Sequence, residues 1–279
     1  MFDIAIVGAG ELGGELAHQV AGADLARSVR LLDEHGTSAA GKALDITQAA
    51  PIERFSTRVS GGADLHEATA AAVVVIADRA TGGEWSGEEG LALLKRICGH
   101  SCALLICAGA TQRELIERAV RELGLPRARV VGSAPEALAS GLRALIALET
   151  KHSVRDISAT VLGIPPAGIV VPWESAAIAG LPALSALDTP AKRRIDARLP
   201  QLWPPGPHAL ASAAKKAIEA IAGRSRQTMS AFIAPDDSAG RRTRAVALPA
   251  TLCGEGIAAA DVPTLTSHDR VALENAMLL

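Results

Sequence analysis

The first half of the chain alternates short apolar runs with segments whose apolar residues recur every three or four positions. Buried strands are predicted for the apolar runs at residues 3–7, 29–32, 73–77 and 103–107. Amphipathic helices are predicted for the segments at residues 11–20, 38–47, 88–98 and 114–123. Helices that connect successive strands produce a parallel sheet covered on both faces. The pattern therefore predicts an α/β fold built on a parallel sheet.

The second half follows a different pattern. Strands are predicted at residues 157–162, 168–171, 227–233 and 244–248, and helices at residues 209–222 and 267–278, the last with Ser267 as its N-cap. A polar turn at residues 235–240 predicts that two of these strands form an antiparallel hairpin. Because the regular alternation ends near residue 145, we expect a parallel-sheet domain over residues 1–145 and an α+β domain over residues 146–279.

A glycine-rich turn joins the first predicted strand to the first predicted helix, and it has the spacing GxGxxG. Gly8 permits a tight turn, Gly10 lets the backbone approach a pyrophosphate, and Gly13 allows close packing of helix against strand. Asp33 ends the second strand, where its carboxylate would accept hydrogen bonds from a ribose and repel a 2′-phosphate. The predicted NAD-binding residues are Gly8, Gly10, Glu11, Leu12, Gly13 and Asp33. A glycine-rich turn without a ligand is the alternative.

Composition and charge argue against several kinds of partner. The 28 basic and 30 acidic residues give a net charge of −2, and the chain has no Tyr, three Phe and three Trp, so nucleic acid is not expected. No apolar run reaches the roughly 18 residues of a membrane helix, and the first residues do not resemble a signal peptide. Cys98 and Cys102 could form half of a metal site, but no matching pair stands nearby, so no metal is expected. Four cysteines are too few for a disulfide framework, and we expect a cytoplasmic protein.

From Gly8 onward the chain resembles the malate/lactate dehydrogenase family, most of all its bacterial malate dehydrogenases. Besides the glycine turn, the similar segments are residues 31–33, 41–46, 49–52, 129–132, 161–163, 179–182 and 246–279. The segment between Pro182 and Gly206 is shorter than in the family. The resemblance implies a Rossmann domain followed by an α+β substrate domain, NAD as cofactor, and assembly into a homodimer or homotetramer.

The resemblance also implies where the family's catalytic groups would lie, and this chain differs at all six positions. In the family, a histidine and an aspartate take the proton, arginines bind the substrate carboxylates, and an asparagine contacts both cofactor and substrate. The residues at these positions are Pro165 for the histidine, Leu138 for the aspartate, Gly141, Thr81 and Gly87 for three arginines, and Ala108 for the asparagine. Proline cannot titrate, and a carboxylate without its arginine is left unpaired. Turnover of malate or lactate is therefore not expected.

Two acidic residues would place negative charge beside the expected dinucleotide. Asp78 stands where the family has a glycine close to NAD, and Glu11 lies inside the glycine turn. The leading interpretation is a non-catalytic member of the family, a pseudoenzyme that binds a nucleotide or regulates an unidentified protein partner. One alternative is an NAD-dependent oxidoreductase with rebuilt catalytic groups that acts on a non-dicarboxylate hydroxy or carbonyl substrate. In it His208 would be the acid/base, although a surface histidine is the simpler reading of this residue. The other alternative is a structural protein with an empty cleft.

Overall fold

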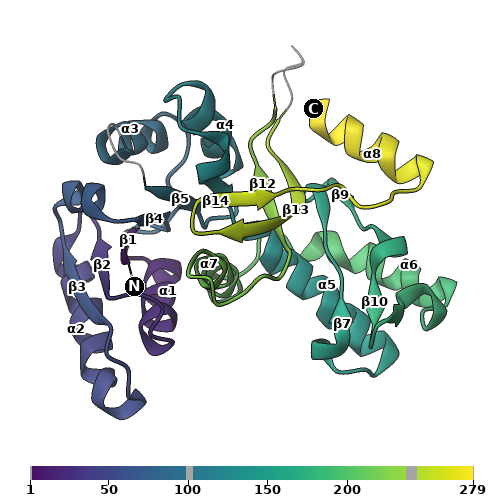
Figure 1. Ribbon diagram of the computed structural model, residues 1–279, viewed down its shortest axis with the longest axis horizontal. Coiled ribbons are helices and arrows are strands. Elements are labelled where there is room, and N and C mark those ends of the chain that lie inside the picture. The colour runs from purple at the N-terminus through teal and green to yellow at the C-terminus, as the bar shows by residue number, and fades with distance from the viewer. Residues whose placement is uncertain (1, 99–102, 237–243, 279) are drawn as a thin grey trace.

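One long sheet runs through the molecule in the computed structural model, which describes residues 2–98, 103–236 and 244–278 (Figure 1). Six parallel strands form its first part in the order β3-β2-β1-β4-β5-β6. They are β1 (Asp3–Val7), β2 (Ser28–Leu32), β3 (Arg58–Gly62), β4 (Val73–Ile76), β5 (Leu104–Cys107) and β6 (Val130–Gly132). This order is that of dinucleotide-binding sheets, in which ligands bind at the carboxyl ends of the strands.

The helices of this half cover both faces of the sheet, as the sequence predicts. They are α1 (Glu11–Gly22), α2 (Gly36–Glu53), α3 (Gly87–Cys98), α4 (Arg113–Arg121) and α5 (Ala134–Thr150). Helices α3 and α4 lie on one face and α1 on the other (Figure 1). Helix α1 buries Leu12, Leu16 and Val20, which are spaced four residues apart. Burial of each such side chain contributes about 1.5–3 kcal/mol, and it fixes the helix that carries the glycine turn.

The second half of the chain extends the same sheet with antiparallel strands. They are β12 (Met229–Ile233), β13 (Val246–Cys253), β8 (Leu162–Ile164) and β9 (Gly168–Val170), with β14 (Gly256–Ala259) beside β13. A second sheet holds β7 (Ile157–Ser158), β10 (Ala177–Ile178) and β11 (Leu181–Pro182), and the helices are α6 (Thr189–Arg198), α7 (Pro207–Ile221) and α8 (Ser267–Leu278). The predicted hairpin is confirmed by the antiparallel pairing of β12 with β13, although residues 237–240 of its turn lie outside the described residues.

Two local predictions for this half are wrong. The single strand predicted at residues 157–162 is divided between β7 and β8, which belong to different sheets. The chain passes from the second sheet to the first at this point, and the Val161 amide donates to Ser230 Oγ at 2.9 Å instead of to a strand partner. Helix α8 is capped by Thr266 and not by Ser267, because Thr266 Oγ1 accepts from the Asp269 amide at 3.1 Å.

The two halves are joined by shared structure. Helix α5 runs through residue 145, where the domain boundary is predicted, and β12 pairs with β6 so that Phe232 stands opposite Gly132. Helix α7 lies beside α1, and Gln19 Nε2 donates to Ser212 Oγ at 3.3 Å (Figure 1). The division at residue 145 therefore stays a prediction. Within the described part of the chain, no helix is both long and apolar enough to cross a membrane.

Candidate functional site

The glycine turn lies at the carboxyl end of β1, where the sequence predicts it. Gly8 has a φ of +114°, and a Cβ on it would lie 2.3 Å from the Asp78 carbonyl oxygen. A Cβ on Gly13 would lie 1.9 Å from the Gly8 carbonyl oxygen, so only glycine permits α1 to approach β1 this closely. Both geometries are those that the GxGxxG spacing predicts.

The space beside Gly10 is filled by the side chain of Asp78, which directly follows β4 and Ala77. Asp78 Oδ2 accepts from the Leu12 amide at 3.2 Å, and Oδ1 accepts from the Gly13 amide at 3.0 Å. A Cβ on Gly10 would lie 2.2 Å from Asp78 Oδ2. The carboxylate thus binds the amides at the N-terminus of α1, where the helix dipole also favours a negative group. These are the groups that a pyrophosphate uses in a dinucleotide site.

Asp33 is buried at the end of β2, and its carboxylate binds three backbone amides. Oδ2 accepts from Ala9 at 2.8 Å and from Ala80 at 2.9 Å, and Oδ1 accepts from His35 at 2.9 Å. Asp33 therefore ties the glycine turn to the segment that follows β4. Its contact with a ribose stays a prediction.

The loop between β4 and α3 carries a second carboxylate into the same edge of the sheet. Glu84 Oε1 accepts from the Ala110 amide at 2.8 Å, and Oε2 accepts from the amide and the hydroxyl of Thr111, each at 2.7 Å. A Cβ on Gly109 would lie 2.3 Å from Glu84 Oε2. The guanidinium of Arg79 lies 4.2 Å from the centre of the Trp85 ring and also pairs with Glu89. These contacts hold the loop against the strand ends.

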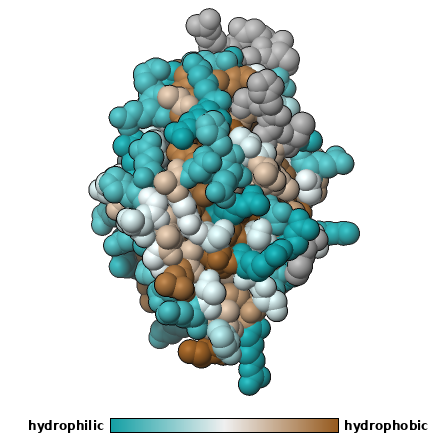
Figure 2. Space-filling model, turned by 90° about the vertical axis from the view of Figure 1, so that its left-hand side faces the viewer, coloured by the Kyte–Doolittle hydropathy of each residue, from teal (hydrophilic) through white to brown (hydrophobic). Residues whose placement is uncertain are grey.

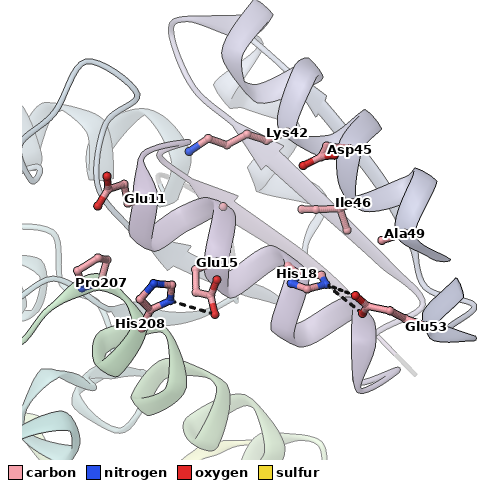
Figure 3. A pocket seen from close by; sticks show the side chains of 11 residues that line it. Glu11, Glu15, His18, Lys42, Asp45, Ile46, Ala49, Glu53, Pro207 and His208 are labelled. Carbon is pink, nitrogen blue, oxygen red and sulfur yellow. Dashed lines mark hydrogen bonds and ion pairs between the residues drawn. The ribbon is translucent and has the colours of Figure 1, made fainter.

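A separate pocket of about 520 Å³ lies between α1, α2 and the start of α7 (Figure 3). His208 is 82% exposed, and its Nδ1 lies 3.3 Å from Glu15 Oε1, while His18 faces Glu53. A hydrogen bond from Gln19 lowers the pKa of Glu15, and the pairing with His208 lowers it further. Sequence reasoning found His208 and missed its partner Glu15.

The predicted residue Glu11 also lines this pocket. Its side chain is exposed, so it does not enter the space beside Gly10. Lys42 of α2 donates to the Gly10 carbonyl oxygen at 2.5 Å and places a cation beside the glycine turn. Among the described residues, no group of three or more His, Cys, Asp or Glu side chains is arranged to hold a metal, and Cys102 lies outside them.

The six positions at which the resemblance places catalytic and substrate-binding groups differ in their exposure. Leu138, Ala108 and Pro165 are buried. A Cβ on Gly141 would lie 2.7 Å from Leu202 Cδ1, so a larger side chain there would displace Leu202. Thr81 is exposed on the loop between β4 and α3, and Gly87 is exposed as the first residue of α3. The chain therefore carries no titratable side chain at any of these positions.

Sequence reasoning missed the buried carboxylate of Glu136, near the start of α5. Its Oε1 lies 2.7 Å from Arg143 Nη2 and 2.6 Å from Lys216 Nζ, and its Oε2 accepts from the Ser230 amide at 2.8 Å. The glutamate thus ties together α5, α7 and β12. Arg143 follows Glu136 by two turns on α5, so the glutamate could have been found by searching for acidic residues on the same helix face as an arginine.

Comparison with known proteins agrees with this architecture. Residues 2–97 match the model of the lactate/malate dehydrogenase NAD-binding domain. Malate dehydrogenase from Thioalkalivibrio sulfidiphilus is 37% identical over 171 residues, which cover 58% of this chain and 56% of the relative. Malate dehydrogenase from Chloroherpeton thalassium is 30% identical over 168 residues, which cover 57% of this chain and 54% of the relative. The chain is therefore similar to the malate/lactate dehydrogenases, and residues 2–97 match their NAD-binding domain.

Solved structures of this family share the fold across nearly the whole chain. Malate dehydrogenase from Salinibacter ruber has a TM-score of 0.85 at 23% identity and covers 98% of this chain and 93% of its own. Lactate dehydrogenase from Cryptosporidium parvum, complexed with lactic acid and nicotinamide adenine dinucleotide, has a TM-score of 0.84 at 23% identity and covers 98% and 94%. The predicted fold class is confirmed. The domain model that matches residues 2–97 is that of an NAD-binding domain, so NAD is the expected cofactor. The chain spans about half the length of the curated relatives it matches.

Proposed function

We propose that this chain is a non-catalytic member of the malate/lactate dehydrogenase family that has kept the NAD-binding fold and acts as a nucleotide-binding or regulatory protein. The observation that carries this proposal is the burial of Leu138 and Pro165 at the two positions where the resemblance places the proton-transfer pair. Neither side chain exchanges a proton. A hydride transfer that must be coupled to loss or gain of a proton has no acid or base at these positions.

The substrate side of the cleft supports the same proposal. Leu202 lies over Gly141, where an arginine would bind a carboxylate. Arg79 is the arginine that the loop itself supplies, and its guanidinium is engaged by Trp85 and Glu89. Glu84 adds a negative charge to the edge of the sheet. A dicarboxylate would therefore meet repulsion without a compensating bidentate partner.

The backbone around the glycine turn fits a dinucleotide once Asp78 has moved away. The amides of Leu12 and Gly13 would hold the pyrophosphate, and Asp33 would face the ribose. When bound, NAD supplies a hydride acceptor. The residues of this chain would bind and orient the cofactor without supplying the proton relay.

One observation favours the oxidoreductase alternative. The pair of His208 and Glu15 is a histidine with a carboxylate partner, which is an arrangement that acid/base catalysis uses. This alternative predicts NAD-dependent turnover of a neutral alcohol or carbonyl compound, and loss of that turnover in His208→Gln. The non-catalytic proposal predicts no turnover with a panel of such compounds.

A homodimer or homotetramer is part of the proposal. Leu44 and Ile52 on α2 are 60% and 83% exposed. Figure 2 views the face on the left of Figure 1 and shows hydrophobic spots among hydrophilic side chains there. Exposed apolar side chains on one helix provide surface for a second copy or for a regulated protein. We also propose a cytoplasmic location, for which the support is the free, buried thiols of Cys98 and Cys107.

The proposal is tested by steady-state assays of the purified protein with malate, oxaloacetate, lactate and pyruvate, and with NAD(H) and NADP(H). We expect no turnover with any of them. Gly10→Val controls for contaminating host enzymes, because a rate that this substitution leaves unchanged does not come from the cleft. A rate in the wild-type protein that Gly10→Val abolishes would contradict the proposal.

A further inference from the structure

The segment from Asp78 to Glu84 places two carboxylates on amides that belong to other parts of the chain. Asp78 binds the first turn of α1, which is 65 and 66 residues away in sequence, and Glu84 binds the turn before α4. The two acidic residues also stand opposite each other in an antiparallel bridge. One short loop thus covers the carboxyl ends of two strands with negative charge.

The amides that Asp78 binds cannot serve a phosphate at the same time. Each N–H has a single proton to donate, and a second anion in the same place would be repelled by the first. Gly10 shows how close the two positions are, because the room beside its Cα is taken by Asp78 Oδ2. Binding of a pyrophosphate and closure of the Asp78 side chain therefore exclude each other.

The closed arrangement is built from several contacts. The Arg79 amide donates to the Gly83 carbonyl oxygen, and the Gly82 amide donates to the Arg79 carbonyl oxygen, each at 2.9 Å. Asp33 links Ala80 to the glycine turn, and Trp85 is buried beneath Arg79. The loop thus has a defined closed conformation in which the Asp78 carboxylate binds the amides of Leu12 and Gly13.

We propose that Asp78 sets the affinity of this chain for dinucleotides, because its carboxylate occupies the pyrophosphate position and must leave before NAD binds. The inference rests on the proposed function, in which the cleft accepts a dinucleotide. The measured dissociation constant equals the intrinsic one divided by the fraction of molecules in which Asp78 has moved away. Removal of the carboxylate raises that fraction toward one and tightens binding.

The experiment compares wild-type protein with Asp78→Gly and Asp78→Asn by isothermal titration with NADH and with ADP-ribose. We expect both variants to bind both ligands at least tenfold more tightly than wild type. Asp78→Asn keeps most of the side-chain volume, so it tests the charge if the glycine variant does not fold. Trp85 fluorescence follows the loop in the same titration, since this ring packs under Arg79.

Asp188→Asn is the matched control. Asp188 also accepts a backbone amide at a helix start, that of Ala191 at 2.7 Å, but it caps α6 and takes no part in the cleft. This variant loses a negative charge and a cap without opening the pyrophosphate position. We expect it to bind NADH with wild-type affinity.

Three results would overturn the inference. Equal affinities of wild type and both Asp78 variants would show that Asp78 does not compete with the nucleotide, while nucleotide binding itself would stand. No binding by any variant would reject both the inference and the nucleotide-binding part of the proposed function. A similar gain in Asp188→Asn would show that the effect comes from net charge and not from the occupied amides.

Discussion

The glycine turn and the region around α5 are expected to differ from the malate/lactate dehydrogenases in different ways. At the turn, the backbone amides and Asp33 are present, but the side chain of Asp78 occupies the amides of Leu12 and Gly13. Around α5, the resemblance places Leu138 where the malate/lactate dehydrogenases carry an aspartate, and Leu138 is buried in an apolar cluster. We expect a ligand or one substitution to reverse the first difference. We expect single substitutions not to reverse the second difference, because Leu138 is packed among apolar side chains.

Restoring the family's catalytic groups tests this difference most strongly. We expect the combined variant Pro165→His, Leu138→Asp, Gly141→Arg, Thr81→Arg and Gly87→Arg to show no malate dehydrogenation. Leu138→Asp alone should lower the free energy of unfolding by about 4 kcal/mol, because it buries a carboxylate among apolar side chains. Urea denaturation measures the cost, and a coupled NADH assay measures the activity.

Leu148→Asp is the control on the same helix. Leu148 is 69% exposed, so the new charge stays in water and should change stability by less than about 0.5 kcal/mol. Measurable malate turnover by the combined variant would show that the region around α5 is an intact scaffold that lacks only its reactive groups.

The glycine turn should tolerate changes at Asp78 but not at Gly13. Gly13→Val places a side chain against the Gly8 carbonyl oxygen, and we expect it to lower the free energy of unfolding by about 3 kcal/mol. Gly41→Ala on α2 is the matched control, because a Cβ there meets no atom within 4 Å and alanine favours a helix. A stable Gly13→Val protein would mean that α1 can shift away from β1.

The Glu136 network links the region around α5 to α7. Glu136→Gln removes the negative charge that pairs with both Arg143 and Lys216. We expect the free energy of unfolding to fall by about 2 kcal/mol. Asp196→Asn breaks the exposed pair with Lys192 and should cost less than about 0.5 kcal/mol. Both variants are measured by thermal and by urea denaturation. Equal losses of stability in Glu136→Gln and Asp196→Asn would show that burial does not distinguish the two ion pairs.

The smallest effect is expected at the amino end of β1, far from the glycine turn. Hydrogen bonds from Arg27 and Ser28 lower the pKa of Asp3 to about 2. Because the pKa is lower in the folded state, the contribution is fully present above about pH 4 and is lost as the pH falls toward 2. Arg27 is largely exposed, so the contribution should be below about 1 kcal/mol. The stability difference between wild type and Asp3→Asn should shrink over this pH range, and a constant difference would contradict the prediction.

Local patterns predicted most elements of the parallel half, and the exceptions have physical reasons. Strands β1, β2, β4 and β5 are short apolar runs, and α1 and α3 carry apolar stripes, so each can be recognised from its own residues. Strand β3 was not predicted, because Arg58–Gly62 contains one apolar side chain and two glycines. It forms because β2 offers it a complete row of hydrogen-bonding partners.

The sequence by itself determined the parallel α/β fold and the glycine turn with Asp33, and it predicts that the catalytic residues of the malate/lactate dehydrogenases are replaced. These features depend on periodicity, spacing and residue identity, which are local. Only the tertiary structure decided three contacts. Asp78 binds the amides of α1, Glu84 accepts hydrogen bonds from Thr111, and Glu136 pairs with Lys216. Each of these contacts joins residues that are 27 to 80 positions apart. The contacts of Asp78 and Glu84 arise because the order of strands across the sheet brings β4 beside β1 and β5, and the contact of Glu136 arises because α7 packs against α5. No local pattern encodes either arrangement.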